Sequence, residues 1–140
     1  MGKPITNTSC HCTKLRRSAE NLTAFYDALI SPAGLTARQY SLLHGIEKGE
    51  GCTVRELAGR TELERSTLAR SLKPLKAAGL VCDGKAPGAR DSRLALTEQG
   101  RQACAKARRL WAAAQQQLEE KLGPEKLAAL ERLLEELQNL

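Results

Sequence analysis

The chain has 140 residues, of which 41% are apolar, 27% charged and only 3% aromatic, and its formal net charge is +6. This length fits one domain over residues 1–140, and the apolar content excludes a disordered chain. The longest uninterrupted apolar run covers residues 110–114, whereas a membrane-spanning helix needs about 20 such residues. Residues 1–21 lack the apolar stretch of a secretion signal, so we expect a cytoplasmic protein that contacts no membrane.

Two amphipathic helices are predicted in the first third of the chain. Between residues 15 and 29 the apolar positions alternate at spacings of four and three, the pattern of a helix with one apolar face. The breaker Ser31-Pro32-Ala33-Gly34 ends this helix. Thr36 is placed to cap a second helix, which is expected to run to about residue 48.

The next segment predicts two further helices. Thr53 and Glu56 have the spacing of a capping box, which indicates a short third helix. A fourth helix is expected over residues 65–78, and Gly79 is typical of the residue after a helix end. Pro74 lies inside the fourth helix and removes one of its backbone hydrogen bonds.

A hairpin and two more helices complete the pattern. Short strands are predicted at residues 80–82 and 93–96, around a turn-rich loop. Thr97 is placed to cap a long helix, and Gly123-Pro124 interrupts it. The last helix shows apolar positions at Leu127, Leu130, Leu134 and Leu137. This order of elements indicates a mainly α-helical fold with a small two-stranded β-wing, the arrangement of a winged helix-turn-helix.

The fourth predicted helix has two chemically different faces. Leu68, Leu72 and Leu75 fall on one side of a helical wheel, and small polar or cationic side chains fall on the other. Arginine can form two hydrogen bonds to guanine in the major groove, and serine or threonine can reach bases or phosphates. We therefore predict that this helix contacts DNA. The expected contact residues are Arg65, Ser66, Thr67, Arg70 and Lys73.

Cationic residues also surround the predicted hairpin. Lys85, Arg90 and Arg93 lie in or beside its loop, and narrow minor grooves attract guanidinium groups, so we add all three to the predicted DNA contacts. Asp91 lies two residues before Arg93 and is expected to form an ion pair there. From Arg55 to Arg93 the chain has nine Lys or Arg and five Asp or Glu, which leaves +4 of the net +6 in this segment.

The set of motifs, in this order, resembles the MarR family of bacterial transcription regulators. The motifs are Leu35-Thr36-Ala37-Arg38-Gln39-Tyr40, Thr53-Val54-Arg55-Glu56-Leu57-Ala58, Arg65-Ser66-Thr67-Leu68, the stretch from Leu75 to Val81, Arg90-Asp91-Ser92-Arg93 and Leu96-Thr97-Glu98-Gln99-Gly100. The resemblance implies a homodimer that binds a pseudo-palindromic operator. It implies that Ser66, Thr67 and Arg70 contact DNA from the recognition helix. It further implies a wing-tip contact by Arg90 and an ion pair between Asp91 and Arg93.

The same resemblance divides the chain into functional regions. Residues 35–97 are expected to form the winged lobe, and the helices within 13–34 and 98–140 to form the dimerisation region. The apolar stripes of the first and last helices support this division, since a small three-helix core does not need them. The expected function is a sequence-specific DNA-binding transcriptional regulator, a repressor that is released by a small molecule or an oxidant.

Other classes of function are less consistent with the sequence. Residues 79–85 have the glycine and lysine spacing of a P-loop, but Ala86 follows them, and a phosphate loop joins a strand to a helix rather than a helix to a hairpin. We expect no enzymatic activity and no cofactor. A helical protein–protein adaptor is the alternative, and the arginines Arg90 and Arg93 argue against it, because an adaptor needs no cationic hairpin tip.

The five cysteines form no pattern of a disulfide framework. Cys52, Cys82 and Cys104 are scattered along the chain and are expected to be small core residues. Cys10-His11-Cys12 precedes the first predicted helix, where the helix dipole lowers the pKa of a thiol. This cluster has three interpretations, namely a plain tail, a metal site and a redox site. Zinc takes about four ligands, so a metal site would need the partner's tail, and we predict no metal.

In the redox interpretation, Cys12 is the reactive thiol and Cys10 the resolving one. Cys12 and Tyr26 are 14 residues apart, which is similar to the separation of cysteine and tyrosine in organic-hydroperoxide sensors of the MarR family. The second tyrosine of that pattern is replaced here by Arg16.

A small-molecule effector is the other expected signal. MarR-like proteins often bind small anionic or aromatic molecules between the dimer helices and the winged lobe. Tyr40, His44 and Trp111 are the candidate effector-pocket residues in this sequence.

Overall fold

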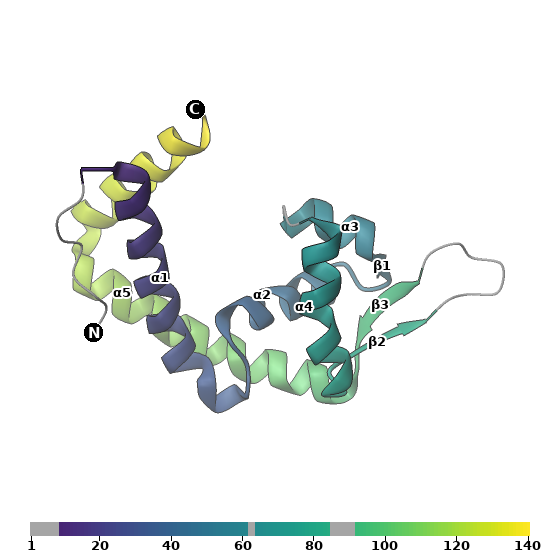
Figure 1. Cartoon of the computed structure of the whole chain (residues 1–140). Helices are drawn as coiled ribbons and strands as arrows, with labels where there is room; N and C mark the ends of the chain where they lie inside the picture. The colour runs from purple at the N-terminus through teal and green to yellow at the C-terminus, as the bar shows by residue number, and fades with distance from the viewer. Residues whose placement is uncertain (1–8, 62–63, 85–91) are drawn as a thin grey trace.

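A computed structural model of the chain describes residues 9–61, 64–84 and 92–140. A winged lobe lies at one end and a helical arm at the other, and the longest helix joins them (Figure 1). The elements are α1 (His11–Ile30), the 3-10 turn η1 (Ser31–Ala33), α2 (Ala37–Lys48), β1 (Cys52–Thr53), α3 (Val54–Thr61), α4 (Arg65–Ala77), β2 (Val81–Gly84), β3 (Arg93–Leu96) and α5 (Glu98–Gln138). The predicted fold class, mainly α-helical with a small β-wing, is confirmed.

The wing is a three-stranded antiparallel sheet in the order β1-β3-β2. β3 is the central strand. Its Leu96 pairs with Val81 of β2 along one edge, and its Leu94 pairs with Cys52 of β1 along the other. The prediction of a two-stranded wing was therefore wrong. β1 has only two residues, which is too short for the alternation of apolar and polar side chains that identifies a strand.

Cys82 is exposed on β2, which corrects the expectation that it belongs to the core. Successive side chains of a strand point to opposite faces. Val81 is buried, so its neighbour Cys82 faces outward, where its thiol lies 3.6 Å from the carbonyl oxygen of Ala95. Cys52 and Cys104 are buried, as predicted.

Leucines from every helix of the winged lobe meet in its core. Leu43, Leu57, Leu68 and Leu72 are almost completely buried, and Leu94 closes the core from the sheet. Burying one such side chain contributes about 1.5–3 kcal/mol, so these contacts hold the helices together despite the low aromatic content. The α5 helix adds smaller residues to this core at its near end.

Three threonines cap helices at the predicted positions. The side chain of Thr36 accepts a hydrogen bond from the Gln39 amide, and the Gln39 side chain accepts one from the Thr36 amide. The Thr53 hydroxyl accepts a hydrogen bond from the Glu56 amide at 3.1 Å, and that of Thr97 accepts one from the Gly100 amide. These caps satisfy amides that have no partner within the helix.

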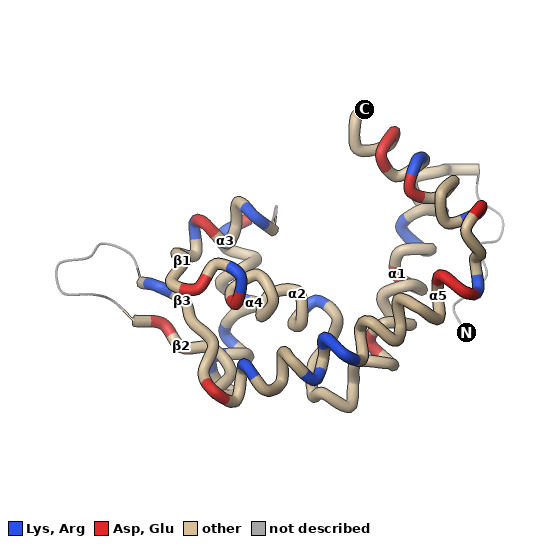
Figure 2. Tube along the Cα trace, turned by 180° about the vertical axis from the view of Figure 1, so that it is seen from behind, with Lys and Arg blue, Asp and Glu red and all other residues tan. Residues whose placement is uncertain are grey.

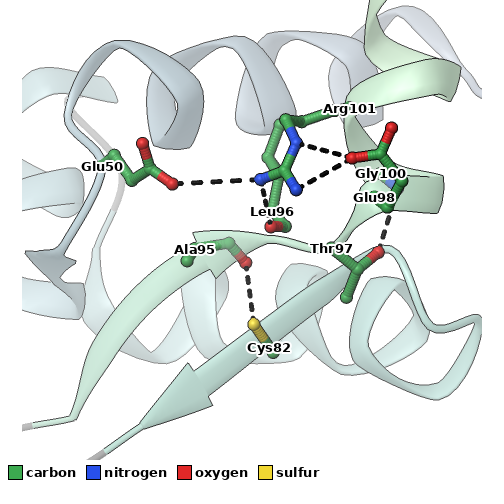
Figure 3. A network of polar contacts seen from close by, with 8 residues as sticks. All are labelled: Glu50, Cys82, Ala95, Leu96, Thr97, Glu98, Gly100 and Arg101. Atoms are coloured by element: carbon green, nitrogen blue, oxygen red, sulfur yellow. Dashed lines mark hydrogen bonds and ion pairs between the residues drawn. The ribbon is translucent and has the colours of Figure 1, made fainter.

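The junction of β3 and α5 is tied to the end of α4 by polar contacts. The Thr97 hydroxyl donates to the carbonyl of Gly79 at 2.6 Å, and the Thr97 amide donates to that of Leu80 at 3.0 Å. One turn later, Arg101 donates to the carboxylate of Glu98 and to the Leu96 carbonyl, and its guanidinium lies 4.0 Å from Glu50 (Figure 3).

The helical arm consists of α1 packed against the far part of α5 (Figure 1). The Tyr26 hydroxyl donates a hydrogen bond to Gln115 across this contact. The backbone of Gly123 is not helical (φ 80°, ψ 162°), so the predicted interruption of the long helix is present. Leu133 is 57% exposed and Leu137 46% exposed, and Leu15 is also exposed. No helix among residues 9–61, 64–84 and 92–140 is apolar enough over sufficient length to cross a membrane.

The contact between Gly100 and Leu80 yields a prediction about stability. A Cβ atom at residue 100 would lie 2.0 Å from the Leu80 carbonyl oxygen, so Gly100→Ala should lower the free energy of unfolding by about 1–3 kcal/mol. Gly59→Ala is the matched control, because a Cβ there meets nothing within 4 Å and alanine favours the helix by about 0.5–1 kcal/mol.

Urea unfolding at one fixed protein concentration measures both variants. An unchanged midpoint for Gly100→Ala would show that the junction adapts to the extra atom and that this close contact is not needed.

Candidate nucleic-acid interface

The outward face of α4 carries the side chains predicted to contact DNA. Arg65, Ser66, Arg70 and Lys73 are exposed, and Thr67 is half-buried. The opposite face is fixed in the core by Leu68, Leu72 and Leu75, which are 0–1% exposed. The helix is therefore held by its apolar side and presents hydroxyls and cations to the solvent.

The cations of this face carry no carboxylate partner in the described part of the chain. None of the ion pairs found there involves Arg65, Arg70 or Lys73. Lys76, on the next turn, differs, because its ammonium group lies 2.8 Å from the Asp83 carboxylate of β2. Figure 2 shows Lys and Arg on α4 and at the start of β3. An unpaired cation on an exposed helix face can bind a phosphate or a base edge without first losing a partner.

The wing residues are described only in part. Lys85, Arg90 and Asp91 lie outside the described residues. Arg93 begins β3, and its guanidinium donates a hydrogen bond to the carbonyl of Gly51 at 2.9 Å. The same nitrogen lies 3.6 Å from Glu56 Oε1. Sequence reasoning missed Glu56 as a partner of Arg93, because that contact depends on the pairing of β3 with the unpredicted β1.

The three predicted effector-pocket residues are neighbours. The ring of Tyr40 lies 5.9 Å from that of His44 and 6.4 Å from that of Trp111, measured between centroids. Burial raises the pKa of Tyr40. The groove in this region has a volume of about 650 Å³ and is lined by His44, but by neither Tyr40 nor Trp111.

This groove lies between α1, α2 and α3 and is cationic. Arg38, Lys48 and Arg60 line it, together with Thr23 of α1, and its described lining contains no carboxylate. The Nδ1 atom of His44 is buried and has no hydrogen-bond partner among the described residues. The lining thus offers positive charge to a small molecule.

An ion pair joins α2 to α5. Arg108 of α5 forms an ion pair with Glu47 of α2, and the same guanidinium lies 3.8 Å from the buried thiol of Cys104. Sequence reasoning missed this pair, because the two residues are 61 positions apart and no local pattern connects them.

The two cysteines at the start of α1 are exposed and have different surroundings. Cys10 occupies the N-cap position, and its pKa is lowered, chiefly by hydrogen bonding with Thr13. Cys12 lies in the first turn, where the Arg16 guanidinium is 3.4 Å from its sulfur. Burial instead raises the pKa of Cys52 and Cys104.

Tyr26 does not lie near these cysteines within one chain. Fourteen residues of a continuous helix place it about 21 Å from Cys12, and its hydroxyl donates to Gln115. Burial raises the pKa of Tyr26, and the charge of Glu119 adds to this effect. In the described residues, no three His, Cys, Asp or Glu side chains group as a metal site.

Comparison with known proteins identifies the family of this chain. Residues 33–90 match a family model described as the MarR family. A complex of the M. tuberculosis transcriptional regulator MosR with DNA has 35% sequence identity, covers 92% of this chain and 98% of that one, and gives a TM-score of 0.73. The transcriptional repressor CouR bound to a 23-mer DNA duplex has 26% identity, covers 92% of each chain and gives a TM-score of 0.82.

A second CouR structure holds a small molecule. CouR bound to p-coumaroyl-CoA has 25% identity, covers 92% of this chain and 91% of that one, and gives a TM-score of 0.83. Among curated proteins, none matches significantly. The family model, the MosR identity and the shared fold lead to one conclusion. The chain belongs to the MarR family of winged helix transcriptional regulators, which bind DNA and are not enzymes.

Proposed function

We propose that this protein is a repressor that binds a pseudo-palindromic operator as a homodimer and leaves it in response to a chemical signal. The observation that carries the proposal is the exposed face of α4, where Arg65, Arg70 and Lys73 stand beside hydroxyl groups and have no carboxylate partner among the described residues. The DNA complexes of MosR and CouR support it.

Arg70 is the residue whose loss should weaken sequence-specific binding most directly. It lies one turn into α4 with its side chain exposed. After operator selection from random duplexes, Arg70→Ala should lower the affinity by about 1–3 kcal/mol and relax the preference at one base pair. Arg109→Ala is the control, because it removes an exposed cation of α5 instead.

Fluorescence anisotropy at several salt concentrations measures both variants. Failure of the reduced parent protein to select any duplex at low salt would contradict the proposed function and favour the protein–protein adaptor. Equal losses for Arg70→Ala and Arg109→Ala would show that binding depends on overall charge rather than on the α4 face.

The exposed apolar side chains of the arm support the homodimer. Leu15 and Leu22 on α1 are exposed, as are Leu133, Leu134 and Leu137 at the end of α5. Neighbouring exposed leucines on packed helices mark an interaction surface, and a two-fold axis would bury the same residues on both protomers. The operator half-sites should then be about 10–10.5 base pairs apart.

Leu137→Lys should dissociate the dimer. Burial of one leucine contributes about 1.5–3 kcal/mol, and a symmetric interface loses it twice, so the dissociation constant should rise by more than about tenfold. Gln102→Lys adds the same charge at an exposed position near the start of α5 and is the control.

Sedimentation velocity at micromolar concentration measures the association. A parent protein that sediments as a monomer, or a Leu137→Lys variant as fully dimeric as Gln102→Lys, would contradict this interface.

The signal that we propose is an oxidant, because exposed thiols lie at the start of α1. The lowered pKa of Cys10 favours its thiolate at the start of α1. Cys12 is exposed two residues further on, where the Arg16 guanidinium contacts its sulfur. A thiolate attacks an organic hydroperoxide to give sulfenic acid and an alcohol, and a second thiol then forms a disulfide with loss of water. Cys10 becomes the first candidate thiolate in this scheme, whereas the sequence favoured Cys12.

At neutral pH, Cys10 should react with a thiol reagent faster than Cys82, the exposed cysteine of β2. A lowered pKa leaves more of Cys10 as thiolate below the ordinary thiol pKa, so its advantage should shrink as the pH rises through that ordinary value. Peptide mapping by mass spectrometry across a pH series measures the rates, with Cys52 and Cys104 as buried controls.

The Cys10→Ser and Cys12→Ser variants then test the connection to DNA binding. Peroxide should release the parent protein from its operator and leave the double variant bound. Release of the double variant to the same extent would contradict an oxidant signal through these thiols, and the cationic groove beside His44 would become the candidate site for a small anionic signal.

A further inference from the structure

We propose that Glu56 and Arg93 form a brace that holds the wing against α3, and that Arg93 supports DNA binding through this brace rather than by contacting DNA. The inference rests on the proposed DNA-binding function and changes the role of Arg93 in it. Glu56 thereby becomes a positioning residue, although a carboxylate on a DNA-binding lobe repels the phosphate backbone.

Arg93 lies at the root of the wing, where both neighbouring strands reach it. Its backbone pairs with Thr53 of β1 and with Gly84 of β2. Its side chain turns to the β1 side, because the guanidinium donates to the Gly51 carbonyl at 2.9 Å and lies 3.6 Å from Glu56. The charge of Arg93 is therefore already partnered.

The groups that receive this guanidinium are themselves held in place. The Glu56 amide donates to the Thr53 hydroxyl at 3.1 Å in the first turn of α3. Gly51 has a positive φ of 80°, a conformation that favours glycine, and its amide donates to the Leu94 carbonyl at 3.0 Å. Backbone and side-chain contacts therefore connect the turn before β1 to β3 in both directions.

The cations of α4 and Arg93 differ in whether they have a carboxylate partner. On α4 the cations Arg65, Arg70 and Lys73 have no carboxylate partner in the described part of the chain, whereas Arg93 has one. A guanidinium that contacts a phosphate would have to share its charge with Glu56. If the Arg93 side chain turned to DNA, it would give up its contacts with the Gly51 carbonyl and with Glu56.

The sign of one substitution distinguishes a brace from a simple surface charge. Removal of a carboxylate near DNA should tighten binding by electrostatics. If Glu56 is a brace, Glu56→Gln should instead weaken operator binding about threefold to fivefold, the effect that an exposed ion pair can support. Glu64→Gln is the matched control, because Glu64 is exposed at the N-cap of α4 and makes no side-chain capping bond; it should tighten binding or leave it unchanged.

The salt dependence distinguishes the brace from a phosphate contact by Arg93. Loss of one phosphate contact reduces the slope of log affinity against log salt by about one. The brace predicts an unchanged slope for Glu56→Gln. It also predicts that Arg93→Gln weakens binding without lowering the slope, since a guanidinium held by Gly51 and Glu56 contacts no phosphate.

Hydrogen exchange provides a readout independent of DNA. In Glu56→Gln the Gly51 amide should exchange faster while the buried amides of α4 keep their protection, which shows local loosening of the wing without global unfolding. The brace would be overturned if the parent protein binds DNA and the Glu56→Gln variant binds it as tightly as the Glu64→Gln variant does. A salt slope reduced by about one in Arg93→Gln would also overturn it, whereas absence of DNA binding by the parent would contradict the proposed function itself.

Discussion

The turn from β3 into α5 constrains the rest of the structure, because single residues there serve two elements at once. Thr97 caps α5 with its hydroxyl and uses the same group to donate to the Gly79 carbonyl after α4. Gly100 lets the first turn of α5 approach the Leu80 backbone. The direction of α5, which reaches the arm, is therefore set by its contacts with the end of α4, so the orientations of α4 and of the arm are fixed together.

The ion pairs divide the cationic side chains of the described residues into paired and unpaired groups. Arg93, Arg101 and Arg108 each pair with a carboxylate of a different element, and each pair lies where two parts of the fold meet. The cations on the outer face of α4 have no such partner among the described residues. Paired cations fix geometry, and unpaired cations remain available to phosphates. A positive total charge alone does not separate these two uses.

The two candidate signals would act on this frame from different places. The thiols of Cys10 and Cys12 lie at the outer end of the arm, so oxidation there would have to act through α1 and α5 (Figure 1). The groove beside His44 touches α1, α2 and α3 directly. A molecule bound in it would act on the relative position of the arm and the winged lobe, because the groove is lined by residues of both.

The sequence alone determined the features that depend on local spacing. The caps at Thr36, Thr53 and Thr97, the buried leucines of α4 and the interruption at Gly123 all follow from residues within one or two helical turns, where periodicity and capping chemistry are sufficient. The motif order also supported the family.

Only the tertiary structure decided the features that depend on distant residues. β1 exists because β3 pairs with it, and this pairing brings Glu56 to Arg93, a partner 37 positions away. The exposure of Cys82 depends on which face of β2 meets the core. The joining of Glu47 to Arg108 depends on how α5 crosses α2. Such contacts form between segments whose spacing in the chain carries no periodic signal, so packing of the whole core had to bring them together.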